Sequence, residues 1–164
     1  MLSTVSALGA QNIGAHKNER ARQTLYYAAL IASLFGLAVS IIMQFAADSV
    51  VSLFTDASDP EGAMVVQLGG QYMRGYVWDT LFAGIHFSFS GYFCAIGKSL
   101  LSFLHNMIAI VLVRIPGAYM ASLMFPDTLF PMGLATTAGS FLSVIICVIA
   151  FMILLRKERK NTTY

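Results

Sequence analysis

The sequence is poor in charged residues, which make up 11% of its 164 residues against 57% hydrophobic ones. Soluble domains usually carry about 25% charged residues, so this composition and a mean hydropathy of +0.72 exclude an ordinary soluble domain. The net charge is only +2, and the basic residues stand in short segments rather than on one face, which excludes a nucleic-acid-binding surface. We therefore expect a protein whose partner is the lipid bilayer.

Cysteine is also scarce, with only Cys94 and Cys147 present, each inside an apolar stretch. Isolated thiols in such positions are typical of small packing residues rather than of a disulfide. The sequence contains no phosphate-binding loop, no Cys/His metal spacing and no nucleophile elbow. We therefore expect neither an enzyme nor a metal or cofactor site.

The sequence does contain four long apolar stretches. Each is long enough for a helix to cross a hydrocarbon core of about 30 Å. They predict membrane-spanning helices at about 24–45, 72–96, 100–125 and 132–155, followed by a tail at 156–164. The predicted fold class is an all-α membrane protein with four transmembrane helices.

Basic residues gather on one side of these predicted helices. Eight of the ten precede the first helix, separate the second from the third or follow the fourth: Lys17, Arg20, Arg22, Lys98, Arg156, Lys157, Arg159 and Lys160. The other two connections carry acids instead: Asp48, Asp56, Asp59, Glu61 and Asp127. The positive-inside rule therefore predicts a multi-pass protein with both chain ends in the cytoplasm.

Two predicted helices carry small residues at every fourth position. In the first these are Ala28, Ala32, Gly36 and Ser40, and in the fourth they are Ala135, Gly139, Ser143 and Cys147. Small residues at this spacing allow helix backbones to approach closely within a bilayer. We expect both stripes to be packing faces.

The long connection between the first two predicted helices contains a helix start. Asp59 suits the N-cap, Pro60 the first helical position and Glu61 the first turn. We expect a helix to begin there and to continue past Gly69-Gly70 into the second membrane span.

Polar residues form a stripe on the second predicted helix. Asp79, His86 and Ser90 are seven and four residues apart, which places them within about 40° of one another on a helical wheel. A carboxylate inside a membrane is costly and usually faces a bundle interior or a wet cavity. The stripe is therefore a candidate ion or proton site, or a contact for a cationic substrate. The alternative is that Asp79 is simply hydrated at the outer edge.

Arg114 lies at about the middle of the third predicted helix, just before a kink expected at Pro116. A guanidinium at this depth needs a partner. Asp79 is one candidate, since it lies within roughly 6 Å of the same depth when both helices are counted from the turn that joins them. Lining a transport cavity and pairing with residues outside this chain are the alternatives. His105, nine residues earlier, is expected on the opposite helix face as an interfacial histidine, and Arg74 as an anchor in an outer aromatic belt.

Three segments carry a family resemblance. Residues 10–15, AQNIGA, followed by Lys17 and Glu19-Arg20-Ala21, resemble the QNxGA…ERA segment of MATE-type multidrug efflux transporters. Residues 90–99, SGYFCAIGKS, resemble the end of that family's tenth helix, and residues 113–116, VRIP, resemble the centre of its eleventh. The three segments occur in the family's order and span nearly the whole chain.

The resemblance implies a twelve-helix fold of two six-helix lobes. Residues 1–164 would then form a partial carboxy-terminal lobe, comprising helices nine to twelve and the tail of helix eight. Twelve spans of about 20 residues need about 240 residues, so the missing amino-terminal helices would be partners of this chain. Gln11, Asn12, Gly14 and Arg20 would serve lobe organisation at the cytoplasmic end.

The function implied is part of a secondary active antiporter in the bacterial cell membrane. Such a protein would export cationic or amphipathic drugs in exchange for Na⁺ or H⁺. The family's sodium-coupled branch uses an aspartate on its tenth helix, and Asp79 is on the matching helix, about one turn further out. Two alternatives are a four-helix small multidrug exporter acting as an oligomer and a non-transporting membrane scaffold. The small exporter would need an ionisable residue in the middle of its first helix, and residues 24–45 contain none. A scaffold would not explain an arginine at the membrane depth of Arg114.

Overall fold

The computed structural model describes residues 1–55 and 58–162, and every regular element among them is a helix. The elements are α1 (Leu2–Gly14), α2 (Asn18–Val51), α3 (Pro60–Tyr76), α4 (Asp79–Ala95), α5 (Ser99–Ala109), the π-helix η1 (Ile110–Arg114), α6 (Ile115–Met124) and α7 (Phe130–Thr162). The all-α fold class is confirmed. Asp56, one of the acids assigned above to an outer connection, lies outside the described residues, as do the last two residues of the predicted tail.

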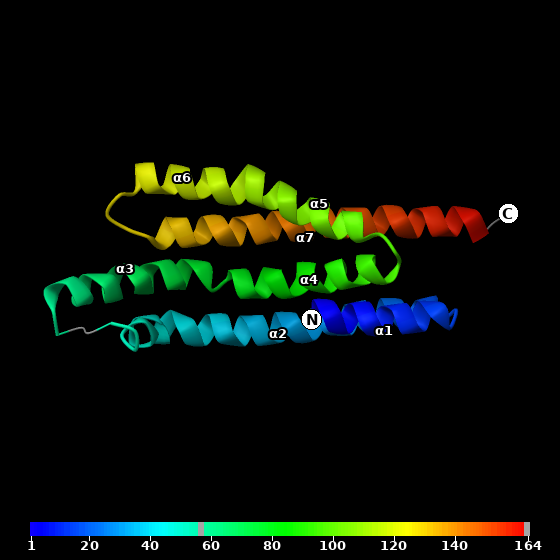
Figure 1. The fold of residues 1–164 in the computed structure, drawn as a ribbon, viewed down its shortest axis with the longest axis horizontal. Helices are drawn as coiled ribbons and strands as arrows, with labels where there is room; N and C mark the ends of the chain where they lie inside the picture. Colours follow the sequence, from blue (N-terminus) through cyan, green and yellow to red (C-terminus); the bar gives the residue numbers. More distant parts are fainter. Residues whose placement is uncertain (56–57, 163–164) are drawn as a thin grey trace.

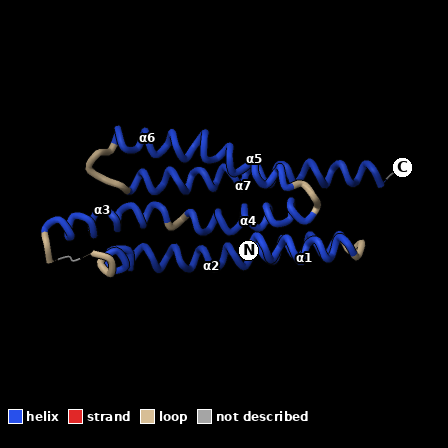
Figure 2. Tube along the Cα trace, viewed as in Figure 1, coloured by secondary structure: helices blue, strands red, loops and turns tan. Residues whose placement is uncertain are grey.

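The helices lie side by side in an elongated bundle (Figure 1). α4 is its centre and contacts α1, α2, α5 and α7, while α3 packs on α2 and α7. The turns at 15–17 and 96–98 lie at one end of the bundle together with the C-terminus, and the connections after α2 and α6 lie at the other (Figure 2). The connections rich in basic residues thus share one end, as the charge pattern predicts.

Within the part of the chain that the structure describes, three helical segments are long and apolar enough to cross a membrane: Asn18–Val51, Ser99–Met124 and Phe130–Glu158. The second predicted span, 72–96, is not one helix, because α3 ends at Tyr76 and α4 begins at Asp79. As expected, a helix begins at Pro60 with Asp59 before it and runs past Gly69-Gly70 into the predicted span, but it ends there at Tyr76. The break falls at Val77-Trp78, two apolar residues that carry no turn signal.

The small-residue stripes are packing faces, as predicted. Ala28, Ala32, Gly36 and Ser40 are all buried. A Cβ added at Gly36 would lie 2.8 Å from the Cα of Leu81 on α4, and one at Gly84 would lie 2.7 Å from the Cβ of Ala32. The α2 and α4 backbones therefore approach as closely as glycine allows, which maximises van der Waals contact where lipid supplies no hydrophobic drive.

An apolar core lies nearer the end of the bundle that carries the basic residues. It joins α1, α2, α4 and α7 through side chains that include Val5, Leu25, Phe93 and Phe151. The Phe151 ring meets Phe89 edge-on, with ring centroids 5.7 Å apart. Cys147 belongs to this cluster and both cysteines are free, in agreement with their expected role as packing residues.

The third crossing contains the π-helix η1. The N–H of Ile115 donates to the carbonyl of Ile110, five residues back instead of the four of an α-helix. Pro116 lacks an N–H and its ring crowds the carbonyl four residues earlier, so the turn before it widens. The irregularity predicted at Pro116 therefore lies one turn earlier.

Candidate functional site

The break between α3 and α4 lies inside the bundle, where backbone groups released from a helix need new partners. Hydroxyl groups supply them. Thr137 donates to the carbonyl of Gly75 at 3.0 Å, and Ser40 and Thr80 donate to the carbonyl of Val77 at 3.0 and 2.7 Å. Interrupted helices supported in this way line the binding sites of many transporters.

Asp79 is the first residue of α4 after this break and is only 7% exposed. An Nη2 N–H of Arg114 donates to its Oδ1 at 3.1 Å, and the same nitrogen donates to Ser140 Oγ on α7 at 2.5 Å. The positive end of the α4 dipole adds to the stabilisation of the carboxylate. The ion pair that the depth count predicted is present.

The pair lies well inside the bundle. Its Ser140 partner is ten residues beyond Phe130, the first residue of α7, which corresponds to about 15 Å along the helix. Together with the burial of Asp79, this depth disfavours the interpretation of Asp79 as a hydrated residue at the outer edge.

Gly139 makes room for the arginine. A Cβ at this position would lie 3.0 Å from Arg114 Nε and closer still to Arg114 Cγ. The side chain of Arg114 therefore lies directly on the α7 backbone on its way to Asp79. A glycine predicted to serve helix packing thus also positions the guanidinium.

Two histidines extend the polar group along α4. His86 and His105 are 1% and 2% exposed, and their ring centroids are 5.4 Å apart. His86 Nε2 lies 3.5 Å from Ser140 Oγ, and His105 Nε2 lies 2.7 Å from Ser90 Oγ. The predicted stripe of Asp79, His86 and Ser90 is therefore joined, through Ser140 and His105, into one chain of polar groups.

The expectation that His105 is an interfacial histidine on the opposite face from Arg114 was wrong. Nine residues of regular α-helix would separate the two side chains by half a turn. The π-helical turn of η1 contains one residue more than an α-helical turn. Arg114 is therefore rotated about the helix axis by about 100° from the position that a regular α-helix would give it relative to His105. Both residues therefore contact α7, where Ser143 Oγ donates to the His105 carbonyl at 3.3 Å.

Three nitrogens of this polar group are buried without a hydrogen-bond partner among the described residues: His86 Nδ1, His105 Nδ1 and Arg114 Nε. Buried polar atoms in folded proteins are nearly always paired. Their concentration around one ion pair makes this region the candidate site for a proton, a cation or a polar ligand group. Among the described residues no cluster of three or more His, Cys, Asp or Glu could hold a metal ion.

Arg74 has a role that the sequence did not indicate. Its Nη2 donates to Asp48 Oδ2 at 2.8 Å and its Nε to the Gln44 carbonyl at 3.1 Å, so it ties α3 to α2. Tyr72 and Tyr76 stack with ring centroids 5.7 Å apart. Membership of an aromatic belt stays a prediction for these residues.

The residues of the amino-terminal motif lie apart from the polar group. Gln11, Asn12 and Gly14 form the last turn of α1 and Arg20 the first turn of α2, at the end of the bundle that carries the basic residues (Figure 1). Asn12 Nδ2 donates to the Leu8 carbonyl at 2.8 Å, within its own helix. Their place fits a structural role at this turn.

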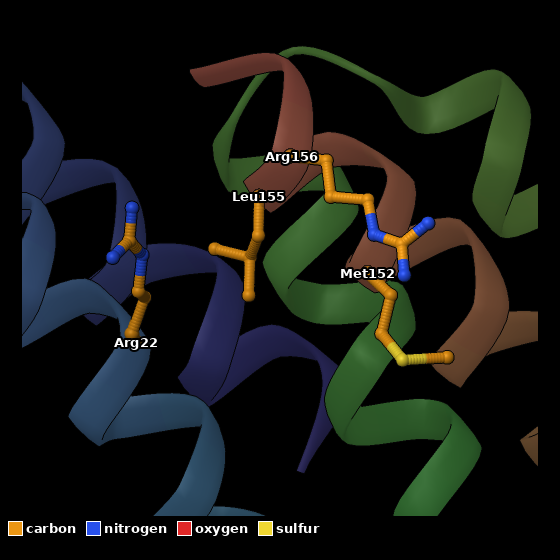
Figure 3. A pocket seen from close by; sticks show the side chains of 4 residues that line it. All are labelled: Arg22, Met152, Leu155 and Arg156. Carbon is orange, nitrogen blue, oxygen red and sulfur yellow. The ribbon is translucent and has the colours of Figure 1, made fainter. Parts of the chain in front are cut away.

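A hollow of about 290 Å³ opens between α2 and α7 at the same end of the bundle (Figure 3). Arg22 lines it from α2, and Met152, Leu155 and Arg156 line it from α7. The Arg22 guanidinium is held by Glu158 at 2.5 Å and by Glu19 at 2.7 Å. Its charge is therefore already balanced within the chain.

Comparison with known protein families gives a match. The family model MatE matches residues 1–120, which include the amino-terminal motif, the broken helix and Asp79–Arg114. No curated protein and no solved structure matches the chain. Because the family model covers most of the sequence, the chain belongs to the MatE family of multidrug and toxic compound efflux transporters.

Proposed function

We propose that this chain forms part of the carboxy-terminal lobe of a secondary active antiporter, one that exports cationic or amphipathic compounds in exchange for Na⁺ or H⁺. The observation that carries the proposal is the Asp79–Arg114 pair, buried beside the helix break at 3.1 Å. A bundle that only spans the membrane would require neither charge, because apolar residues would fill the same space at lower cost.

The proposed mechanism is competition for the Asp79 carboxylate. In the arrangement described here Arg114 neutralises it. A coupling cation or a cationic drug that binds Asp79 would have to displace the guanidinium, so that ion and drug would exclude each other. Exchange would follow if the two occupied forms favour different lobe arrangements, because a ligand shifts a conformational equilibrium only through its difference in affinity for the two states.

The exposed faces of the bundle support the proposal that further helices complete the lobe. α6 has no buried residue, and Ile115, Tyr119, Met120 and Leu123 on it are each more than half exposed. These apolar faces fit lipid or neighbouring helices. The charge pattern supports placing the turn between α1 and α2 and the C-terminus on the cytoplasmic side of the membrane. Met1 itself lies beside Gly84 and Phe87, part of the way along the bundle, so the expectation of a cytoplasmic end holds for the turn after α1 and not for Met1.

The experiment that tests this proposal is counterflow of a cationic dye in proteoliposomes that contain the complete transporter. Asp79→Asn should abolish exchange driven by a Na⁺ or a proton gradient, and the gradient that drives exchange in the unaltered protein identifies the ion. Asp127→Asn, in the exposed connection before α7, is the matched control and should leave exchange unchanged.

Two outcomes would contradict the proposal. Full exchange in Asp79→Asn would remove the residue from the coupling mechanism. Equal exchange per molecule with lower protein abundance would assign the pair to folding, which is the result expected of a membrane scaffold.

A further inference from the structure

A groove of about 530 Å³ runs between the start of α5 and the last part of α7. It lies on the far side of α7 from the Arg22 hollow, at the same end of the bundle. Its lining has two chemistries: Lys98 and Lys157 carry charge, and Leu101, Ala150, Ile153 and Leu154 are apolar. The groove is therefore amphipathic.

The charged and apolar residues are separated in depth. Lys98 precedes the first residue of α5, and Lys157 lies near the end of the Phe130–Glu158 segment that is long and apolar enough to cross a membrane. Ala150 is seven residues before Lys157, about 10 Å deeper along the helix. In a membrane crossed by this segment, the lysines would lie at the level of the lipid head groups and the apolar lining beside the acyl chains.

The charge of the groove is not balanced within the described part of the chain. The ion pairs at this end involve Arg22, Glu19 and Glu158, and neither lysine takes part in one. Lys98 and Lys157 are both exposed. Two ammonium groups at the charged end of an apolar groove attract an anion that carries a hydrocarbon tail.

We propose that this groove binds one anionic phospholipid from the membrane leaflet at this end of the bundle. The phosphate lies between Lys98 and Lys157, and one acyl chain lies along Leu101, Leu154 and Ala150. A zwitterionic lipid offers the same chain but no net charge, so the lysines should select phosphatidylglycerol over phosphatidylcholine. A protein helix in this place would have to bury both ammonium groups. The inference concerns lipid binding and does not depend on transport.

Native mass spectrometry of the purified complete protein with added phosphatidylglycerol or phosphatidylcholine tests the proposal. We expect phosphatidylglycerol to remain bound to the unaltered protein. Each lysine near a membrane surface contributes about fivefold in affinity, so the double variant Lys98→Gln/Lys157→Gln should bind about twenty-five-fold more weakly. Ala150→Phe, which fills the apolar part of the groove and keeps both lysines, should also lose the bound lipid.

Arg156→Gln is the matched control, because it removes one positive charge from the same helix but on the side that faces the Arg22 hollow (Figure 3). It should leave phosphatidylglycerol binding unchanged. Equal binding of both lipids, an unchanged affinity in the double lysine variant, or an equal loss in Arg156→Gln would each overturn the proposal. Binding that Ala150→Phe leaves intact would overturn the placement of the acyl chain.

Discussion

Asp79 and Arg114 meet at 3.1 Å, and each stands at an interruption of its own helix. Asp79 is the first residue of α4 after the break at Val77-Trp78, and Arg114 is the last residue of the π-helix η1. Interruptions of this kind in membrane helices occur where neighbouring groups can satisfy the freed backbone. Here they bring two opposite charges together within the bundle, and this suggests several measurements.

The first prediction concerns the balance of this charge pair. Arg114→Gln should destabilise the protein by about 2–4 kcal/mol, less than the 3–5 kcal/mol of a fully buried pair because the arginine side chain is 28% exposed. Asp79→Asn/Arg114→Gln should recover at least half of this loss, because neither charge is then left without a partner. Thermal unfolding, followed by a dye that reacts with the Cys147 thiol, which is buried in the folded protein, measures both effects.

The discriminating quantity in that double-mutant cycle is the coupling energy between the two sites. A coupling near zero would show that the two charges do not stabilise each other. Arg74→Gln provides a comparison, since its pair with Asp48 is 30% and 51% exposed and a pair of this kind contributes about 0–1 kcal/mol.

The second prediction concerns the histidine that the sequence pattern misplaced. Ser90→Ala removes the partner of His105 Nε2, whose Nδ1 already lacks one among the described residues. A buried polar atom left unpaired costs about 1–3 kcal/mol, so the unfolding midpoint should fall. Ser122→Ala, on the exposed face of α6, is the control and should change stability by less than about 0.5 kcal/mol. Equal midpoints for the two variants would contradict the buried contact.

The third prediction tests the close approach of α2 and α4. Gly36→Val should prevent correct packing, because even a Cβ at this position lies 2.8 Å from the Leu81 Cα and the backbone there cannot give way. Overpacking of this kind costs about 1–3 kcal/mol or more. Gly14→Ala meets no atom within 4 Å and should fold normally. Fluorescence size-exclusion chromatography of both variants in detergent distinguishes a monodisperse from an aggregated product.

The fourth prediction concerns orientation in the membrane. With Cys94 and Cys147 replaced by alanine, a single cysteine at Asp127 should react with a membrane-impermeant maleimide on intact cells. A cysteine at His16 should react only after the cells are opened, because the basic connections favour the cytoplasmic side. Labelling of position 16 on intact cells would contradict the proposed orientation and indicate the opposite one.

The sequence alone determined the class of the protein and much of its architecture. Length and hydropathy of the apolar stretches are enough to predict helices in lipid, because no other open structure can satisfy the backbone there. The four-residue stripe of Ala28, Ala32, Gly36 and Ser40 predicted a packing face, since that spacing places small residues on one side of a helix. Counting residues from a tight turn made Asp79 a candidate partner of Arg114, and the structure shows that ion pair.

The tertiary structure decided what depends on contacts between distant segments. The helix break at Val77-Trp78 is stabilised by Ser40 on α2, which donates to the Val77 carbonyl, and by Thr137 on α7, which donates to the Gly75 carbonyl. No local residue pattern marks the break. The place of His105 depends on the wider turn of η1, which changes the helical phase that a regular α-helix would give. Sequence periodicity fixes which residues share a face only while the helix is regular, and both exceptions occur where this chain gathers its buried polar groups.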